Sequence, residues 1–354
     1  MKAPLITFEY QELLDQTLDL SEKVRAAFGP EGLGICSVSG VPGFPERRQT
    51  LLPLAQRLAE LPEKTKAKLE DSESRWSFGW SHGKEVLENG RPDTLKGSFY
   101  ANPLCDRPTD DPELIKRYPS YCRPNLWPTR DLPELEEAFK SLGRLIVEVG
   151  LLLAEKCDQY VRKRTPHAGA ARLTRVIRES RTTKARLLHY FPPSDAPPPD
   201  AAADDSSWCG WHTDHGSLTG LTSAMYFREG QEVPCPDASA GLYIRNRQGA
   251  LVKAVIPPSN IGFQMGEATQ IHSGGLLRAT PHCVRGISGP SASGVSRATL
   301  AVFMQPQWDE LMDIPPAVAP ETVEVGAWTP RLDFGAFTER TVSRNYCVSD
   351  AVEQ

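Results

Sequence analysis

The chain has 354 residues, of which 40% are hydrophobic and 24% charged, so it is long enough for a substantial core and is not a disordered protein. Its formal net charge of -5 gives no basic field of the kind that binds nucleic acid, so we expect no nucleic-acid partner. The N-terminal residues contain neither a long apolar core nor a small-residue cleavage site and predict no signal peptide.

Helical patterns dominate the first half of the chain. The spacing of apolar residues predicts a strand over residues 4–10, a helix over 10–29, a strand over 32–44 and a helix over 47–70. Residues 72–128 show an irregular pattern, and residues 131–164 predict the longest helix. Pro53 or Pro62 should interrupt the second helix, and Asp131 should cap the last one. The most apolar run, residues 145–154, is too short to span a bilayer, so we expect a buried helix and no membrane partner.

Beyond about residue 180 the pattern changes to short strands separated by Gly, Pro, Asn or Asp. The predicted strands lie within residues 184–193, 220–227, 240–246, 250–258, 260–266, 269–275, 282–286 and 297–306. Many short strands with such turns are typical of a sandwich or barrel. The polar, proline-rich residues 194–207 predict a mobile loop. We therefore expect an all-β core with a helical N-terminal region.

The eight cysteines contain no CxxC pair, which argues against a zinc finger or ribbon. An even count would suit disulfides, but without a secretion signal we expect free thiols. Reduced thiols are typical of the cytoplasm, which is the compartment that the sequence predicts.

The segment "WCGWHTDHGSLTGL" (residues 208–221) carries the clearest chemistry. His212 and Asp214 are two residues apart, so in a strand they point to the same face. A second histidine from another strand would complete the facial 2-His-1-carboxylate set that binds non-haem iron. The alternative is a hydrogen bond between the two side chains at a strand end, with no metal.

This motif and three further segments form a wider pattern. They read "HTDHGSLTGL", "GEATQIHSGG", "TPHCV" and "RAT". Together they resemble the iron(II)/2-oxoglutarate-dependent dioxygenases, in the branch of isopenicillin N synthase and the plant flavonoid and gibberellin oxygenases, whose typical pattern is HxDxGxxTxL, GDxLQxxSNG, a histidine and RxS. Gly216 and Thr219 fall on that pattern, as does the interval from Gly266 to His282. The resemblance covers nearly the whole chain and is weakest in residues 70–120.

The resemblance implies a mainly β fold with a double-stranded β-helix (jelly-roll) core flanked by helices. We expect a mixed, helix-rich N-terminal region over residues 1–178, the jelly-roll core over 179–310 and a C-terminal extension over 311–354. The extension could be a lid or a dimer contact, and the oligomeric state stays open.

The same resemblance implies the residues of the site. His212, Asp214 and His282 would be the ligands of Fe(II), and Arg297 and Thr299 would hold the far carboxylate of 2-oxoglutarate. A guanidinium suits that role because it forms two parallel hydrogen bonds with a carboxylate. In relatives that do not use 2-oxoglutarate, the same pair holds a different carboxylate.

A last segment, "RLLHYFPP", resembles the family's RLNYYPP. His189 would replace the asparagine, and Phe191 would replace a tyrosine whose hydroxyl contacts the co-substrate. Tyr190 could supply that hydroxyl if the alignment shifts by one residue. We therefore expect His189 and Tyr190 beside 2-oxoglutarate.

The remaining histidines are expected to play no part in binding metal. His215 should face away from Asp214 in a strand and lie at the pocket rim or surface. His272 occupies an ordinary position of the family pattern, and His82 and His167 lie in loop or helix contexts that predict surface positions.

These expectations amount to an oxidoreductase that uses Fe(II), 2-oxoglutarate and O2 to hydroxylate or desaturate a small molecule, releasing succinate and CO2. Aromatic and polar residues suited to the substrate pocket are Trp76, Trp80, His82, Phe99, Tyr100, Asn102, Trp211 and Arg278. Such aromatics could equally fill the seam between the two halves of the chain.

Three other functions remain open at this point. An iron oxidase of the same fold would use the triad without 2-oxoglutarate. A catalytically silent binding protein would not need the triad and R-A-T together. A cupin-like metal isomerase or a zinc hydrolase would leave Arg297 and Thr299 unexplained.

Overall fold

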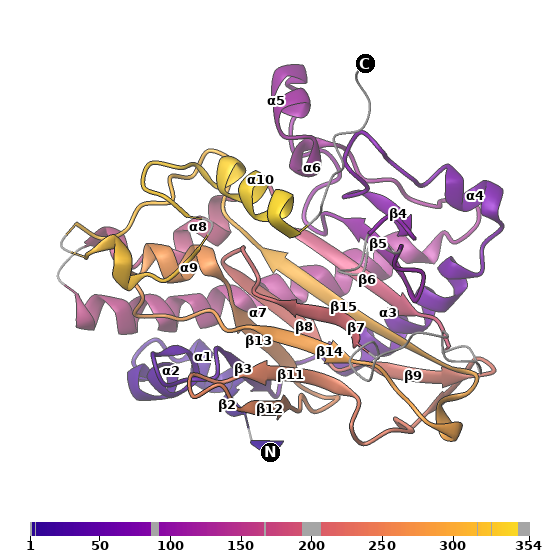
Figure 1. Ribbon diagram of the computed structural model, residues 1–354, viewed down its shortest axis with the longest axis horizontal. Coiled ribbons are helices and arrows are strands. Elements are labelled where there is room, and N and C mark those ends of the chain that lie inside the picture. The colour runs from indigo at the N-terminus through magenta and orange to yellow at the C-terminus, as the bar shows by residue number, and fades with distance from the viewer. Residues whose placement is uncertain are drawn as a thin grey trace.

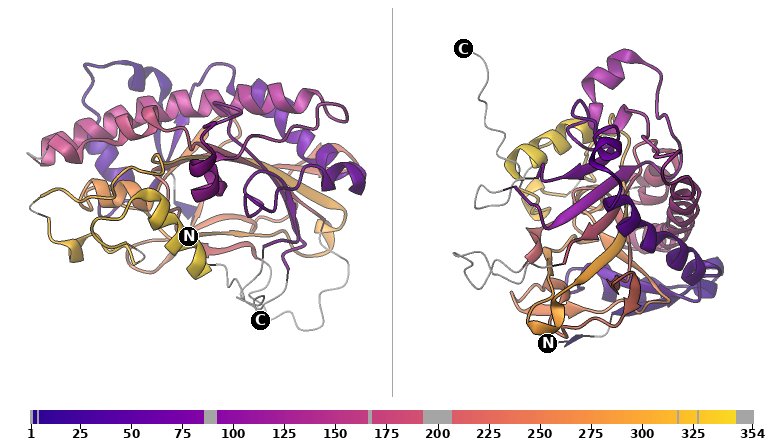
Figure 2. Two further views of the ribbon diagram at one scale, coloured as in Figure 1. Left: turned by 90° about the horizontal axis from the view of Figure 1, so that it is seen from above. Right: turned by 90° about the vertical axis from the view of Figure 1, so that its right-hand side faces the viewer.

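Two β-sheets form the centre of the protein, and helices cover the outside of the larger one (Figures 1 and 2). The computed structural model describes residues 2–3, 5–85, 92–165, 168–192, 207–316, 318–326 and 328–345. His167 and most of the predicted loop at 194–207 lie outside these residues.

The larger sheet runs in the order β2-β3-β13-β8-β15-β6-β5-β4, and β9 pairs with β15 and β10. Its strands are β2 (Ile6–Glu9), β3 (Ile35–Ser39), β4 (Gly79–His82), β5 (Lys96–Ala101), β6 (Lys184–Tyr190), β8 (Leu218–Thr222), β9 (Met225–Arg228), β10 (Gln231–Val233), β13 (Ile261–Met265) and β15 (Val295–Met304).

The smaller sheet runs in the order β1-β12-β11-β14-β7. Its strands are β1 (Lys2–Ala3), β7 (Ser207–His212), β11 (Gly241–Arg245), β12 (Leu251–Ala254) and β14 (His282–Arg285). The prediction of a sheet-rich core flanked by helices is confirmed. The domain boundaries at 178 and 310 stay a prediction.

The helices come mostly from the first half of the chain. They are α1 (Tyr10–Leu14), α2 (Ser21–Phe28), α3 (Phe44–Ala59), α4 (Glu63–Ala67), α5 (Pro112–Arg117), α6 (Pro119–Cys122), α7 (Glu134–Arg164), α8 (Leu173–Glu179), α9 (Glu267–His272) and α10 (Phe334–Asn345). Figure 2 shows α7 running along the outer face of the larger sheet, with α3 beside it. Among the described residues, no helix is both long and apolar enough to cross a membrane.

The two faces of strand β15 lie in different surroundings. Ala298, Leu300, Val302 and Met304 alternate along it and belong to the main hydrophobic core under the helices. The intervening residues point to the opposite face, because successive side chains of a strand alternate. One face of β15 therefore builds the core, and the other is available to a site between the sheets.

Glycines on both sides allow helix α7 to approach the larger sheet closely. A Cβ atom on Gly150 would lie 2.6 Å from Met304 Sδ, and one on Gly220 of β8 would lie 2.2 Å from Ile146 Cγ2. The absence of a side chain at these two positions thus sets the distance between the helix and the strands.

Several local predictions were wrong. The helix predicted over 10–29 is divided into α1 and α2. The interruption predicted at Pro53 or Pro62 is confirmed at Pro62, which lies between α3 and α4, whereas Pro53 lies inside α3 without breaking it. Pro133 rather than Asp131 precedes α7, and no side chain caps that helix. The segment predicted as irregular, 72–128, contains β4 and β5. β4 pairs with β5, and β5 pairs with β6, which comes from a distant part of the chain. The strand predicted over 269–275 is mostly helix α9.

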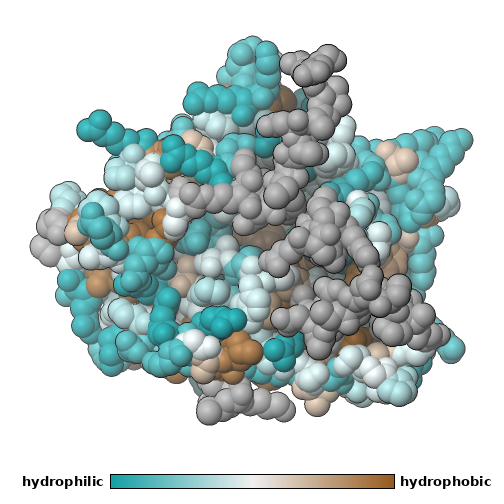
Figure 3. Space-filling view, in the orientation of Figure 1, coloured by the Kyte–Doolittle hydropathy of each residue, from teal (hydrophilic) through white to brown (hydrophobic). Residues whose placement is uncertain are grey.

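The described part of the C-terminal extension packs into a second hydrophobic cluster. Phe334 and Phe337 of α10 are buried against α9 and the α5–α6 segment, and the Tyr121 hydroxyl donates to Thr338 Oγ1 at 2.7 Å. On the face shown in Figure 3, hydrophilic side chains dominate among the described residues, and hydrophobic ones form small separate areas. The seven described cysteines are free, which confirms the prediction of thiols for them.

We expect Gly220→Ala to lower the free energy of unfolding by about 1–3 kcal/mol, because the added methyl overlaps the Ile146 side chain and forces a shift of α7. Urea denaturation would measure the change. Gly169→Ala is the matched control, since only Arg172 Nη2 lies near its Cβ position, at 4.0 Å. Equal stability of the two variants would contradict the proposed close approach of α7.

Candidate functional site

Three side chains from separate parts of the chain meet at one end of the smaller sheet. His282 at the start of β14 pairs directly with His212 at the end of β7, and Asp214 follows β7 by two residues. Asp214 Oδ1 lies 3.8 Å from His212 Nε2 and 3.9 Å from His282 Nε2. One ligand atom from each residue lies within 4.8 Å of the other two, which is a spacing that a single metal ion can bridge.

Neighbouring groups hold each of the three side chains. His212 Nδ1 lies 2.9 Å from the carbonyl oxygen of Gly210, and the Thr219 hydroxyl donates to Asp214 Oδ2 at 2.6 Å. His282 Nδ1 lies 2.5 Å from the amide of Gln264. Contacts of this kind orient ligands before a metal binds.

The charge state of the cluster favours a cation. Burial acts to raise the pKa of Asp214, but the two imidazoles and Thr219 outweigh it, so the pKa lies below its ordinary value and the carboxylate is anionic. Burial lowers the pKa of His282 to about 4, which leaves its imidazole neutral as a metal ligand must be. For His212, burial opposes the charge, but Cys209 and Asp214 raise its pKa to about 10. The neighbours that favour a proton on His212 also attract a metal cation.

The donor set fits non-haem iron. Two imidazoles and one carboxylate on one side of a metal leave positions open on the other side, as the facial triad of iron(II) oxygenases does. The three ligand atoms converge from a strand start, a strand end and the loop after it, so the chain supplies the donors from one side.

A cavity of about 370 Å³ adjoins the triad between the two sheets. The larger sheet contributes alternate residues of β6 and β15, and the smaller sheet contributes residues of β7, β11, β12 and β14. Its walls are mostly apolar, with Leu188, Leu221, Leu242, Ile256, Val284 and Phe303 among them. Such a cavity suits a small molecule held by a few polar groups.

Arg297 is the most distinctive polar group in that cavity. Its side chain is 7% exposed, and its guanidinium lies over the rings of Tyr190 and Trp208, at 4.6 and 5.4 Å from their centroids. Among the residues that the structure describes, its buried Nε and Nη1 have no hydrogen-bond partner. Buried donors without partners are costly, so this guanidinium is suited to an anion that completes its hydrogen bonds.

Thr299 faces the same cavity two residues further along β15. Its hydroxyl already donates to the carbonyl oxygen of Thr222 at 3.1 Å. Thr299 therefore lies where the resemblance implies, with an oxygen that can still accept a hydrogen bond.

The structure separates the two residues predicted from β6. Tyr190 lines the cavity with Arg186 and Leu188, as alternation along the strand requires. His189 is not among the lining residues; it is buried and its ring packs against Phe191, with centroids 4.8 Å apart. The alignment shifted by one residue, with Tyr190 in place of the family's tyrosine, is the one that fits the cavity.

The other described histidines lie away from the three-residue cluster. His272 is buried in α9, where Nε2 lies 3.2 Å from the Leu311 carbonyl oxygen. His82 is half-buried, with Nε2 3.0 Å from the Thr94 carbonyl oxygen. His215, predicted at the pocket rim or surface, is half-buried and is not among the residues that line the cavity: its ring stacks on Phe334 with centroids 5.8 Å apart, and its Nε2 is buried.

The residues suggested for the substrate pocket do not line this cavity. None of Trp76, Trp80, His82, Phe99, Tyr100, Asn102, Trp211 and Arg278 is among the described residues that line the cavity. Trp80 and Phe99 belong to the hydrophobic core, and Arg278 forms an ion pair with Glu324. Arg186, Cys209 and Tyr226 also line the cavity and were not predicted, although alternation along β6 could have indicated Arg186. Cys209 is out of phase with His212, and the register shift between β7 and β14 brings both to the cavity.

A buried ion-pair network adjoins the cavity at Arg186. Its Nη2 donates to Glu85 at 2.5 Å and to Ser98 at 2.7 Å, and Glu85 also pairs with Lys96 at 2.8 Å. Burial acts to raise the pKa of Glu85, but the charges of Arg186 and Lys96 outweigh it and lower that pKa to about 2. Arg186 is thus held in a fixed position on the cavity wall.

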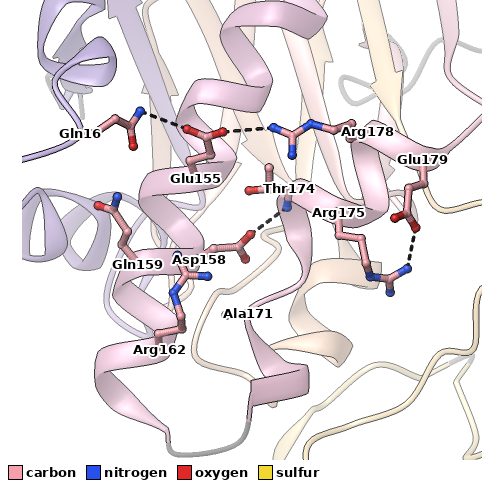
Figure 4. Close-up of a pocket in the computed structure, with 10 residues that line it drawn as sticks. All are labelled: Gln16, Glu155, Asp158, Gln159, Arg162, Ala171, Thr174, Arg175, Arg178 and Glu179. Atoms are coloured by element: carbon pink, nitrogen blue, oxygen red, sulfur yellow. Dashed lines mark hydrogen bonds and ion pairs between the residues drawn. The ribbon is translucent and has the colours of Figure 1, made fainter.

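A second pocket lies on the outside of the molecule between α7 and α8 (Figure 4). Most of its charged residues are engaged with one another: Glu155 accepts from Gln16 and Arg178, and Arg175 pairs with Glu179. Asp158 accepts from the backbone N–H groups of Leu173 and Thr174. These contacts hold α8 on α7 and account for the pocket's polar character.

The fold of the chain is that of the 2-oxoglutarate-dependent oxygenases. No family model matches the chain, and no curated protein matches it. The likeness is to solved structures of low sequence identity, so it establishes the fold alone.

Three of these structures illustrate the likeness. A Caulobacter crescentus protein, provisionally assigned to the 2OG-Fe(II) oxygenase family, is 17% identical with a TM-score of 0.70, over 97% of this chain and 99% of that one. Neurospora crassa T7H, in complex with alpha-KG and 5-formyluracil, is 17% identical with a TM-score of 0.67, over 95% of each chain. JOX2, in complex with 2OG, Fe and JA, is 17% identical with a TM-score of 0.62, over 95% of this chain and 84% of that one.

We expect Glu85→Gln to destabilise the protein by about 3 kcal/mol at neutral pH, because Arg186 and Lys96 lose a buried anionic partner. The folded-state pKa of Glu85 is about 2 and its unfolded value is about 4.3, so the stabilisation is present above pH 4.3 and is lost as the pH falls toward 2. Urea unfolding at several pH values should show the difference from wild type shrinking over that interval.

The control for this pH series is Glu137→Gln, which changes an exposed carboxylate on α7. It should follow the wild-type curve. A difference between Glu85→Gln and wild type that stays constant from pH 6 to pH 2.5 would contradict the role given to the Glu85 charge.

Proposed function

We propose that this protein is a non-haem Fe(II)- and 2-oxoglutarate-dependent dioxygenase that oxidises a small molecule. The observation that carries the proposal is the buried guanidinium of Arg297, whose Nε and Nη1 have no hydrogen-bond partner among the described residues, in the same cavity as the triad of His212, Asp214 and His282. The cavity thus pairs a cation-binding cluster with a carboxylate-binding group, and 2-oxoglutarate needs both.

The strand arrangement supports the finer assignment of the fold. We infer that β6, β8, β13 and β15 on one side and β7, β11, β12 and β14 on the other form a double-stranded β-helix, and that β2–β5 extend the larger sheet. The residues that follow β7 and begin β14 then meet at one open end, where a metal with free coordination positions is accessible to substrate.

The roles of the residues follow from their places. His212, Asp214 and His282 would hold Fe(II), Arg297 would bind the far carboxylate of 2-oxoglutarate, and Thr299 and Tyr190 would lie beside it. When bound, iron with 2-oxoglutarate and O2 supplies the oxidative decarboxylation to succinate and CO2 that drives hydroxylation or desaturation of a C–H bond. The apolar walls keep water out and orient the substrate.

The substrate is proposed as a small molecule, as in the structural relatives. T7H is described with 5-formyluracil and JOX2 with JA, and both ligands are small. The free thiols of the seven described cysteines support the cytoplasm as the proposed compartment.

An anaerobic titration tests the proposal. Protein loaded with Fe(II) should develop a visible charge-transfer band when 2-oxoglutarate is added, and His212→Ala should abolish the band because the triad loses a ligand. Bound iron without a band would favour the oxidase that does not use 2-oxoglutarate. No iron binding by the wild-type protein would favour a silent binding protein.

Arg297→Met should weaken 2-oxoglutarate binding by about 10- to 100-fold, since a charge-assisted hydrogen bond contributes roughly 1.5–3 kcal/mol. The dependence of the charge-transfer band on 2-oxoglutarate concentration gives the dissociation constant. Arg245→Met is the matched control, because Arg245 is an exposed arginine that lies over Trp211. An unchanged dissociation constant for Arg297→Met would refute the assignment of the carboxylate site.

A further inference from the structure

Gln264 of β13 lies directly behind the triad. Its side chain is 1% exposed, and its Nε2 lies 2.5 Å from His282 Nδ1. The same Nε2 lies 3.4 Å from the carbonyl oxygen of Thr280, whereas the buried Oε1 finds no hydrogen-bond partner in the described part of the chain. A buried amide that leaves its acceptor unsatisfied beside an imidazole nitrogen needs a physical explanation.

The position of the hydrogen on the His282 imidazole explains this arrangement. His282 presents Nε2 to Asp214, at 3.9 Å, so a metal in the triad would bind that nitrogen. A neutral imidazole that binds metal through Nε2 carries its hydrogen on Nδ1. Two N–H donors would then face each other at 2.5 Å, which is unfavourable. A half-turn of the amide exchanges its oxygen and nitrogen and places the unpartnered Oε1 opposite Nδ1–H.

The register of the larger sheet strengthens this interpretation. Gln264 pairs across β13 and β8 with Thr219, whose hydroxyl donates to Asp214 Oδ2 at 2.6 Å. Two neighbouring positions of the sheet thus each support one ligand of the triad. His212 is supported separately, from the smaller sheet, by the carbonyl oxygen of Gly210.

We propose that Gln264 is a positioning residue for the metal centre, accepting a hydrogen bond from His282 Nδ1–H through Oε1 and thereby fixing the tautomer that presents Nε2 to the metal. The inference rests on the metal centre of the proposed function, but it does not depend on 2-oxoglutarate. The resemblance that identified the triad did not include Gln264.

The test uses Zn(II) as a probe, so that neither O2 nor turnover is needed. Gln264→Met keeps the length of the side chain and removes the acceptor, and it should weaken Zn(II) binding by about 10- to 100-fold in a chelator competition. Gln264→Glu keeps an acceptor oxygen and should bind Zn(II) as well as wild type does. Asn260→Leu is the matched control: Asn260 is a buried amide just before the other end of β13, and it donates to Ser37 Oγ at 3.4 Å, so its loss should lower stability without weakening Zn(II) binding.

The second readout is the imidazole 15N spectrum of the Zn(II)-loaded protein. His282 should carry its hydrogen on Nδ1 in wild type and in Gln264→Glu, with slow exchange of that hydrogen against solvent, and exchange should be faster in Gln264→Met. Zn(II) binding by Gln264→Met equal to that of wild type, or a wild-type His282 without hydrogen on Nδ1, would overturn the inference alone. Failure of the wild-type protein to bind Zn(II) would overturn the metal centre itself and the inference with it.

Discussion

The antiparallel pairing of β7 with β14 is the constraint on which the site depends. It places His212 opposite His282, 70 positions apart in the chain, with ring centroids 4.2 Å apart. A slip of one residue would turn either histidine to the outer face of the smaller sheet. The register shift that follows between His282 and Val284 confines the direct pairing to the end of the strands. The metal-binding geometry is therefore a property of the sheet and not of the HxD motif alone.

The larger sheet adds a buried cationic side chain to the cavity beside the triad. Its inner face carries Arg297 into an apolar cavity, where Tyr190 and Trp208 cover the guanidinium and water is largely removed. Among the described residues this guanidinium has no anionic partner, and a buried cation of that kind is unfavourable by several kcal/mol, so a carboxylate that entered the cavity would be stabilised. Under the proposed function the cavity holds one site for a cation and one for a carboxylate, and it would select a ligand able to reach both.

The features predictable from the sequence were those with local or motif-based signals. Arg297 and Thr299 alternate on one strand, so their shared face follows from strand geometry. His212 and Asp214 were found through the HxD motif, although Asp214 lies in the loop after β7 and not in the strand that the motif predicted. Strands β4 and β5 were missed because β4 pairs with β5 and β5 in turn pairs with β6, some 90 residues away. The aromatic residues of segment 72–128 could line a pocket or fill a core, and only the packing against α7 decides for Phe99. Gln264 and Arg186 have no local signal, since their roles depend on which strands become neighbours.

The C-terminal extension completes the support of the ligand loop. Phe334 of α10 belongs to a cluster with Ala268 and Ile271 of α9, and its ring stacks on His215, the residue after Asp214. The first residue of α9, Glu267, donates its backbone N–H to the carbonyl oxygen of Asp214 at 2.8 Å. The loop is thus held by α9 at its backbone, by α10 through His215 and by β8 through Thr219. Under the proposed function, the C-terminal helix would thus be part of the framework of the metal site, although none of its described residues belongs to the triad.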